Sequence, residues 1–160
     1  MSADKFKSLV HYVISKCKNP NDMGAVKLNK ILWFSDVLSF KIHGVQMTGE
    51  NYVKRKRGPV PATILRTLRE LENEKKIIVK QSAVPFEPTQ YLSLVDCDHD
   101  VFSESEEDII DAVMHVVCNN YTANGISEAT HTNIWQVASE GEQIPVFATL
   151  VGQQGEITDE

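Results

Sequence analysis

The second half of this 160-residue chain contains no lysine and no arginine. All 16 basic residues lie in residues 1–80 beside 7 acidic ones, a net charge of +9, whereas residues 81–160 carry 15 acidic residues and a net charge of −15. Such an asymmetry concerns partners and solubility rather than fold. Two consequences are open: the halves pack together and neutralise one another, or one half presents its charge to a partner of opposite sign.

Cysteine and long apolar runs are also scarce. The three cysteines, Cys17, Cys97 and Cys118, are odd in number and scattered, which argues against a disulfide framework and favours a reducing compartment. No run of about 18 apolar residues is present, so we expect no membrane span. The first ten residues, MSADKFKSLV, lack the apolar region of a secretory signal. We therefore expect a cytoplasmic protein that does not contact a membrane.

Sequence motifs of catalysis are missing. The chain has no glycine-rich phosphate loop, no GxSxG and no HExxH, and its five histidines are not spaced as a set of metal ligands. The acidic segment 96–107 approximates the ligand spacing of a calcium loop, but Val101 stands where that loop requires glycine. A pairing of Cys97 with His99 is a weaker signal still. We expect no enzymatic activity, no cofactor and no metal.

The most informative stretch runs from residue 27 to residue 61. Its first part predicts a helix that is apolar on nearly every side, with two opposite faces made of Leu28, Ile31, Leu32, Leu38 and Ile42 and of Trp33, Val37 and Phe40. A helix of this kind is normally buried, so we expect it to be the central helix of the domain, ended by Gly44. Asp36 on this helix would need a buried partner, for which Lys30, His43 or a basic strand residue is available.

The remaining elements follow from periodicity and turn residues. Before the central helix, the stripe from Phe6 to Cys17 predicts an amphipathic helix. After it we expect a strand at 52–57, a tight turn at Gly58 and Pro59, and a third helix that starts at Pro61. Its inward positions are Ile64, Leu65, Leu68 and Leu71, and its outward positions are Thr63, Arg66, Thr67 and Glu70.

The later part of the chain predicts a β-hairpin from strands at 76–80 and 89–95, then a fourth helix capped by Ser103 and Glu106. Residues 126–151 indicate short helical pieces anchored by Trp135. The predicted fold is α+β and mostly α: a compact helical domain around a buried central helix, with a small antiparallel hairpin. One domain spans residues 1–151, and residues 152–160 form a polar tail.

The predicted element order is that of a winged-helix module, which makes DNA binding an alternative function. Basic residues at 54–57, with Arg66 and Arg69 nearby, could neutralise phosphates. Alternate residues of an extended strand point to opposite sides, however, so four successive cations would not form one patch. A strand edge protected by charge explains the same run without DNA.

Several segments, in order, resemble the Panacea domain family of SocA-like antitoxins. Residues 27–36, KLNKILWFSD, are similar to its KLQKLLYFA-type helix, and Gly44, MTGE at 47–50 and Tyr52 to the segment that follows. RGPVP at 57–61 is similar to its YGPV-type turn, with Arg57 in place of tyrosine. Near the C-terminus, the resemblance rests on ISEATH at 126–131 and on Trp135, Gly141, Ile144 and Pro145, with Ile134 where a proline is common.

The resemblance implies a non-enzymatic antitoxin of a toxin–antitoxin system that neutralises a cognate protein toxin by direct contact. It also implies an association with mobile elements, prophages and phage defence. A proteolytic adaptor that delivers a toxin to a AAA+ protease is the second role that the resemblance offers. Neither the toxin nor the oligomeric state follows from it.

The contact region that we prefer is the third predicted helix with the turn before it, together with the C-terminal motif. Arginine and tryptophan are favoured at the centres of protein interfaces. Trp135 also suits a partly buried anchor, and His131 a hydrogen bond to a neighbouring loop. The candidate partner-binding residues are Arg55, Arg57, Pro59, Arg66, Arg69, His131 and Trp135.

Overall fold

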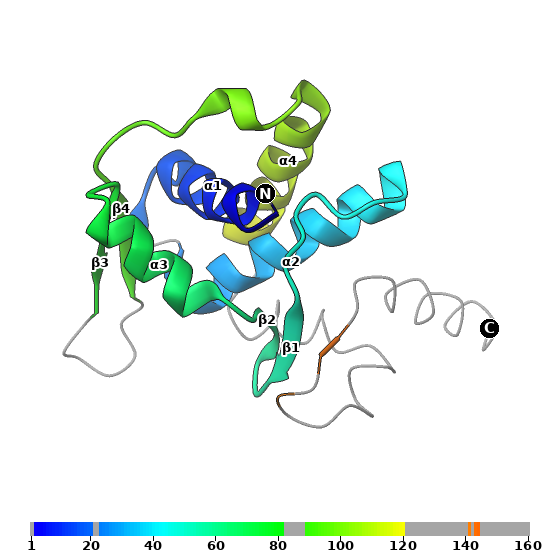
Figure 1. The fold of residues 1–160 in the computed structure, drawn as a ribbon, viewed down its shortest axis with the longest axis horizontal. Coiled ribbons are helices and arrows are strands. Elements are labelled where there is room, and N and C mark those ends of the chain that lie inside the picture. The colour runs from blue at the N-terminus through cyan, green and yellow to red at the C-terminus, as the bar shows by residue number, and fades with distance from the viewer. Residues whose placement is uncertain (1, 21–22, 82–88, 121–140, 142, 145–160) are drawn as a thin grey trace.

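A computed structural model of the chain describes residues 2–20, 23–81, 89–120, 141, 143 and 144 (Figure 1). In order, the elements are α1 (Ser2–Lys16), α2 (Gly24–His43), β1 (Tyr52–Arg55), β2 (Gly58–Pro61), α3 (Ile64–Asn73), β3 (Ile77–Lys80), β4 (Gln90–Ser93), the short 3₁₀ helix η2 (His99–Val101) and α4 (Glu104–Asn120). The predicted α+β, mostly helical class is confirmed. None of the described helices is long and apolar enough to cross a membrane.

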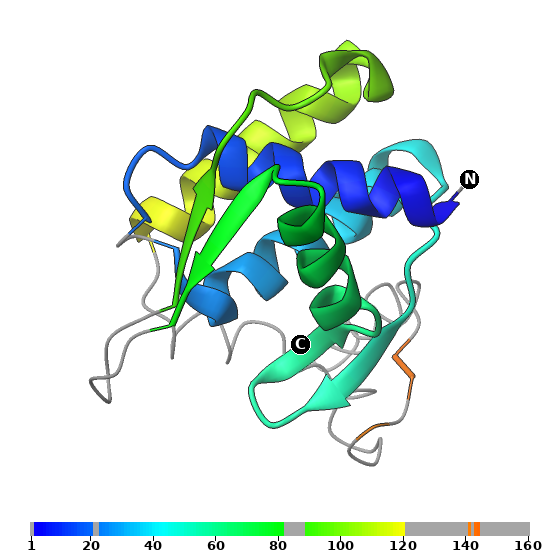
Figure 2. The same cartoon turned by 60° about the vertical axis from the view of Figure 1, so that its left-hand side comes forward.

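Helix α2 is the central element, as its apolar sequence predicts. It packs against α4 and α1 on one side and against β2 on the other, so that it runs through the middle of the molecule in both views (Figures 1 and 2). Leu28, Ile31 and Leu32 are fully buried. The helix ends as predicted, because Gly44 takes φ +78° and its N–H donates to the carbonyl of Phe40. Ile42 is 57% exposed, contrary to expectation, because it lies in the last turn, beyond the packed part of the helix.

The main apolar core lies between α1, α2, α3 and α4. Burial of these side chains is the dominant favourable term in folding. Its largest contributors, each essentially without solvent contact, are Phe6, Leu9, Tyr12, Leu28, Ile31, Leu32, Leu71, Ile77 and Ile110. Most of these residues belong to the stripes that the sequence predicts.

The structure has two small antiparallel sheets where the sequence predicts one. The predicted hairpin is present as β3–β4, with Ile77 opposite Ser93 and Lys80 opposite Gln90. The second sheet joins β1 to β2 through a two-residue turn at Lys56 and Arg57. Gly58 begins β2 with φ +123°, a conformation that glycine adopts without strain. The prediction of a helix starting at Pro61 is wrong, because Pro61 is the last residue of β2 and lies opposite Tyr52.

Helix α3 also differs in detail from the prediction. Its buried residues are Ile64, Thr67, Leu68 and Leu71, whereas Leu65 is 73% exposed. The inward face therefore follows the spacing i, i+3, i+4, i+7 and not the hydrophobicity of each residue. At its C-terminus, Lys75 takes φ 61° and the N–H of Lys76 donates to the carbonyl of Leu71, the geometry of a Schellman cap.

The fourth helix begins with the predicted capping box. The N–H of Glu106 donates to the hydroxyl of Ser103, and the N–H of Ser103 donates to the carboxylate of Glu106. Its inward stripe is buried: Ile109, Ile110, Val113, Met114 and Val117. The helical pieces predicted after this helix lie outside the described residues, apart from residues 141, 143 and 144.

Candidate protein-binding surface

Asp36 on α2 fixes the loop that leads into β1. Its carboxylate accepts from the N–H of Thr48 at 2.7 Å, from the hydroxyl of Thr48 at 2.8 Å and from the hydroxyl of Tyr52 at 2.7 Å. Tyr52 also lies 3.0 Å from the carbonyl of Leu32. The loop around Thr48 and the start of β1 are therefore attached to the central helix by buried hydrogen bonds.

The prediction that a basic side chain pairs with Asp36 is wrong. Lys30, His43 and the basic strand residues do not supply its contacts; two hydroxyls and a backbone N–H do. Burial raises the pKa of Asp36 to about 6, although the hydrogen bonds from Tyr52 and Thr48 oppose that rise. Burial and the neighbouring Asp36 raise the pKa of Tyr52, which keeps its hydroxyl a donor. Neutral donors complete the hydrogen bonds of this carboxylate without burying a second charge beside it.

Lys30, one turn and a half before Asp36, holds the turn of the β1–β2 hairpin. It is 1% exposed, and its Nζ donates to the backbone carbonyl of Arg57. Burial and the positive charge of Arg57 lower the pKa of Lys30 to about 8. A buried lysine thus supports the hairpin from beneath, while the side chains of the turn point into solvent.

Glu50 connects the same loop to the start of α3. Its Oε2 accepts from the N–H of Thr63 at 3.0 Å and from the hydroxyl of Thr63 at 2.6 Å. A carboxylate at this position satisfies a free N–H of the first turn and suits the positive end of the helix dipole. Asp36, Lys30 and Glu50 together set the position of the hairpin and of α3 relative to α2.

A second, smaller apolar cluster lies under the hairpin. It contains Trp33, Val37, Tyr52 and Ile144, with the rings of Trp33 and Tyr52 edge to face at 5.0 Å. Ile144 comes from a segment that lies beside β1: the N–H of Ile144 donates to the carbonyl of Tyr52 and that of Gly141 to the carbonyl of Lys54. β1 therefore has a neighbour on each side, so the hypothesis that its charges protect an open edge is wrong.

The predicted contact residues fall into three groups. Arg55 and Arg57 are exposed at the end of the hairpin, and Arg66 and Arg69 are exposed on α3. Pro59 is buried in β2 opposite Lys54, so its side chain is not part of the surface. His131 and Trp135 lie outside the described residues.

The exposed residues define what we call the basic surface: Arg55, Lys56 and Arg57 at the hairpin end, with Leu65, Arg66 and Arg69 on α3. Figure 2 shows α3 above the β1–β2 hairpin, and residues 62–63 connect the two elements. Because the strand ends at Arg55 and the next two residues form the turn, the four successive cations are not arranged as one extended strand. The exposed Leu65 adds an apolar side chain to this surface, the mixture that partner-binding surfaces contain.

The described acidic residues of the second half lie on α4 and on the connector that precedes it. Helix α4 packs on the side of α2 away from the hairpin, and exposes Glu104, Asp108 and Asp111 (Figure 1). Among the described residues, Lys5 and Glu106 form an ion pair between the two halves at 2.8 Å, whereas Lys7 pairs with Glu74 of its own half at 2.6 Å. The contact of α4 with α2 buries mainly apolar side chains.

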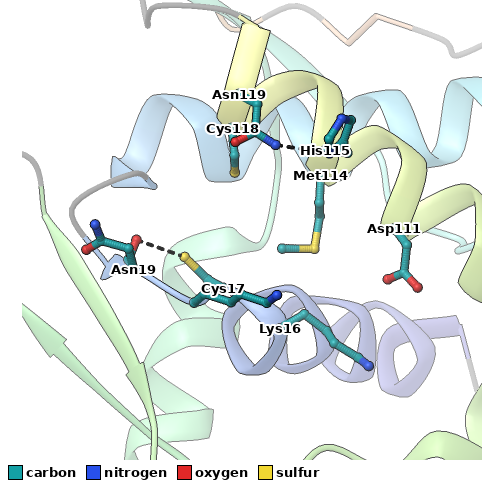
Figure 3. Close-up of a pocket in the computed structure, with 9 residues that line it drawn as sticks. Lys16, Cys17, Asn19, Asp111, Met114, His115, Cys118 and Asn119 are labelled. Carbon is teal, nitrogen blue, oxygen red and sulfur yellow. Dashed lines mark hydrogen bonds between the residues drawn. The ribbon is translucent and has the colours of Figure 1, made fainter.

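A pocket of about 530 Å³ between the end of α1 and α4 is the alternative site (Figure 3). Its polar side chains bond within the protein: Asn119 with His115 at 3.1 Å, and Asp111 with the hydroxyl of Tyr12 at 3.0 Å. We regard it as a surface hollow and the basic surface as the candidate site.

Sequence reasoning missed Thr48, Glu50, Tyr52 and Ile144 as the residues that hold this surface. The signal available was the presence of polar residues in a loop directly after a fully apolar helix. A buried aspartate on that helix requires donors, and the nearest loop is where they are found.

The family model described as "Antitoxin SocA-like, Panacea domain" matches residues 28–136. This range contains α2 from Leu28 onward, both sheets, α3 and α4, and therefore all exposed residues of the basic surface. No curated protein and no solved structure gives a significant match to the chain.

Proposed function

Because the chain belongs to the antitoxin SocA-like, Panacea domain family, we propose that it is a non-enzymatic antitoxin that neutralises a protein toxin by direct binding. We propose further that the toxin binds the basic surface and is acidic where it does so. This proposal rests on the exposure of the hairpin end and of one face of α3. Three buried charged residues, Lys30, Asp36 and Glu50, hold these two elements in place.

The rigidity of this attachment supports a binding role. A surface that is already in its bound conformation loses less conformational entropy when a partner binds. Lys30 and Asp36 are each at most 1% exposed, although a buried charge is costly to maintain. The structure thus spends stability on the position of the hairpin, which is the expected arrangement if that position matters for recognition.

The test is growth of cells that express the gene adjacent to this one, with and without this chain. We expect the neighbour alone to arrest growth, and this chain to restore growth and to co-purify with the neighbour's product. Rescue with loss of the toxin and no stable complex would favour delivery to a AAA+ protease instead. A harmless neighbour would contradict the antitoxin proposal.

DNA binding is the second candidate, because Arg66 and Arg69 are exposed on a helix that precedes a hairpin. A mobility-shift assay on the chain's own promoter at low salt tests it. A shift that is lost with Arg66→Ala and Arg69→Ala would support an autoregulatory role. The absence of any shift would exclude that role. In the described residues β1 pairs with β2 and not with the β3–β4 hairpin, so the three-stranded sheet of a winged helix is not formed.

A further inference from the structure

The connector between β4 and α4 gathers three unlike metal-ligating side chains. One ligand atom each from Asp96, Cys97 and His99 lie within 4.8 Å of one another. The Nε2 atom of His99 is 3.8 Å from the Sγ atom of Cys97 and 3.8 Å from Oδ2 of Asp96. We propose that these three residues bind Zn²⁺.

The distances suit a tetrahedral ion. Zinc binds sulfur at about 2.3 Å and nitrogen or oxygen at about 2.0–2.2 Å, so its ligand atoms are roughly 3.3–3.6 Å from each other. The two distances from Nε2 exceed this by only a few tenths of an ångström. The side chains of Asp96 and His99 are exposed, so rotation would bring their ligand atoms closer to the ion.

Neighbouring groups already orient two of the three ligands. The Oδ1 atom of Asp96 accepts the N–H of Cys97 at 3.1 Å, which leaves Oδ2 for the ion. The Oε2 atom of Glu107 lies 3.6 Å from Nδ1 of His99, on the opposite side of the ring from Cys97. A carboxylate on the second nitrogen of a ligating histidine is the usual outer partner in metal sites, because it fixes the ring and its tautomer. The ring of Tyr12 packs edge-on against His99 at 6.1 Å.

The ligand types select the metal. A thiolate with an imidazole suits zinc and other borderline or soft ions, whereas calcium and magnesium require oxygen ligands. The calcium loop that the acidic spacing suggests is therefore not the site; the Cys97–His99 pair within it is the centre. The surrounding second half contains no lysine or arginine, so its negative charge also attracts a cation. Three protein ligands leave a fourth position for solvent.

A bound ion would fix the connector. Cys97 is buried against the main core, and His99 begins η2, which leads through Phe102 to the start of α4. Joining residues 96–99 through one ion fixes the turn before η2, and the contact of His99 with Glu107 connects this turn to the first turn of α4. Any ligand that binds only the folded state raises the midpoint of thermal unfolding.

The experiment is a titration of the metal-free full chain with Zn²⁺ in competition with a chromophoric chelator, followed by Co²⁺ absorption spectra. We expect one ion per chain, a thiolate-to-cobalt charge-transfer band, and a rise in Tm on addition of Zn²⁺. Cys97→Ser should abolish the band and weaken zinc binding by more than tenfold, as should His99→Gln. Glu107→Gln, which keeps all three ligands, should weaken binding about tenfold.

The matched control is Cys118→Ser combined with His115→Gln, because it removes one thiol and one imidazole from α4. This variant should bind zinc as the native chain does. Zinc binding that survives Cys97→Ser unchanged, or that is lost equally in the control, would overturn the proposal. Variants that are folded without metal, as judged by circular dichroism, make the comparison valid. The proposal does not depend on the antitoxin function and fails or holds independently of it.

Discussion

The two apolar clusters of this molecule are held in different ways. The main core between the four helices consists mostly of aliphatic and aromatic side chains that are buried by packing. The small cluster of Trp33, Val37, Tyr52 and Ile144 lies beside a buried network of Asp36, Thr48 and Tyr52. Packing tolerates many sequences of suitable size, whereas directional hydrogen bonds specify one arrangement. The hairpin that carries the basic surface is attached by the second kind of contact.

The largest expected effect comes from removing the acceptor of that network. Asp36→Ala leaves the N–H and the hydroxyl of Thr48 buried without their acceptor and removes one of the two acceptors of the Tyr52 hydroxyl, so it should lower the free energy of unfolding by about 4 kcal/mol. Urea unfolding measures it. The control is Asp111→Ala, which removes a half-exposed contact with Tyr12 and should cost less than about 1 kcal/mol. Equal costs would mean that the buried network does not hold the hairpin.

The second effect is a dependence of stability on pH. The pKa of Asp36 is about 6 in the folded chain, against about 3.9 in the unfolded one, so the folded state binds the extra proton between these values. Stability should therefore fall by about 3 kcal/mol between about pH 3 and pH 7, about 2 kcal/mol of it between pH 4 and pH 6, and this contribution should then stay constant. Other carboxylates change stability with pH in the opposite direction. The quantity to measure is therefore the difference in unfolding free energy between the native chain and a variant at each pH.

That variant is Asp36→Asn, which keeps the shape and an oxygen for the N–H of Thr48. The hydroxyl of Tyr52 can donate to the carbonyl of Leu32 instead, and its oxygen can then accept from the amide of the asparagine. We expect the variant to lose the pH-dependent difference and to be at least as stable as the native chain at pH 7. A variant curve parallel to the native one from pH 4 to 7 would show that Asp36 does not titrate as described.

Helix α3 offers a matched pair of leucines that separates packing from recognition. Leu68 is 8% exposed and belongs to the main core, so Leu68→Ala should cost about 2.5 kcal/mol of unfolding free energy. Leu65 is 73% exposed, so Leu65→Ala should change stability by less than about 0.5 kcal/mol. If the basic surface binds the toxin, Leu65→Ala should instead weaken that complex. A large loss of stability from Leu65→Ala would contradict the orientation of the helix.

The smallest effect tests one hydrogen bond of the network. Tyr52→Phe keeps the ring that packs on Trp33 and removes only the hydroxyl shared by Asp36 and Leu32, at a cost of about 1.5 kcal/mol. Tyr91→Phe is the control in the main core. It should lower the free energy of unfolding by less, because only the hydroxyl of Tyr52 donates to a buried carboxylate, that of Asp36. Thermal unfolding of both variants measures the difference. A larger loss for Tyr91→Phe would reverse the comparison between the clusters.

The sequence was sufficient for those parts of the fold that local patterns encode. Helix α2, its stop at Gly44 and the capping box of α4 follow from apolar spacing and from terminal residues. Strand β2 could not be predicted, because Gly58 and two prolines in four residues are typical of turns and not of strands. Only contact with α2 and β1 makes this segment extended.

The candidate site was less predictable than the fold. Exposure of Arg55, Arg66 and Arg69 follows from their charge, but the loop that holds them does not follow from any pattern. Asp36 is 12 residues from Thr48 and 16 from Tyr52, and only the folded chain brings them together. Leu65 was assigned to the core by its hydrophobicity, although Thr67 occupies the inward position of that turn.

The affinity of this chain for the product of the adjacent gene tests the location of the binding surface most directly. We predict that Arg66→Ala combined with Arg69→Ala weakens the complex by roughly 100-fold, since arginines at interface centres contribute strongly. The control, Lys18→Ala combined with Lys80→Ala, removes the same charge from exposed positions elsewhere and should change affinity by less than about threefold. Equal affinities for both double variants would contradict the account, because the toxin would then bind a different face of the protein.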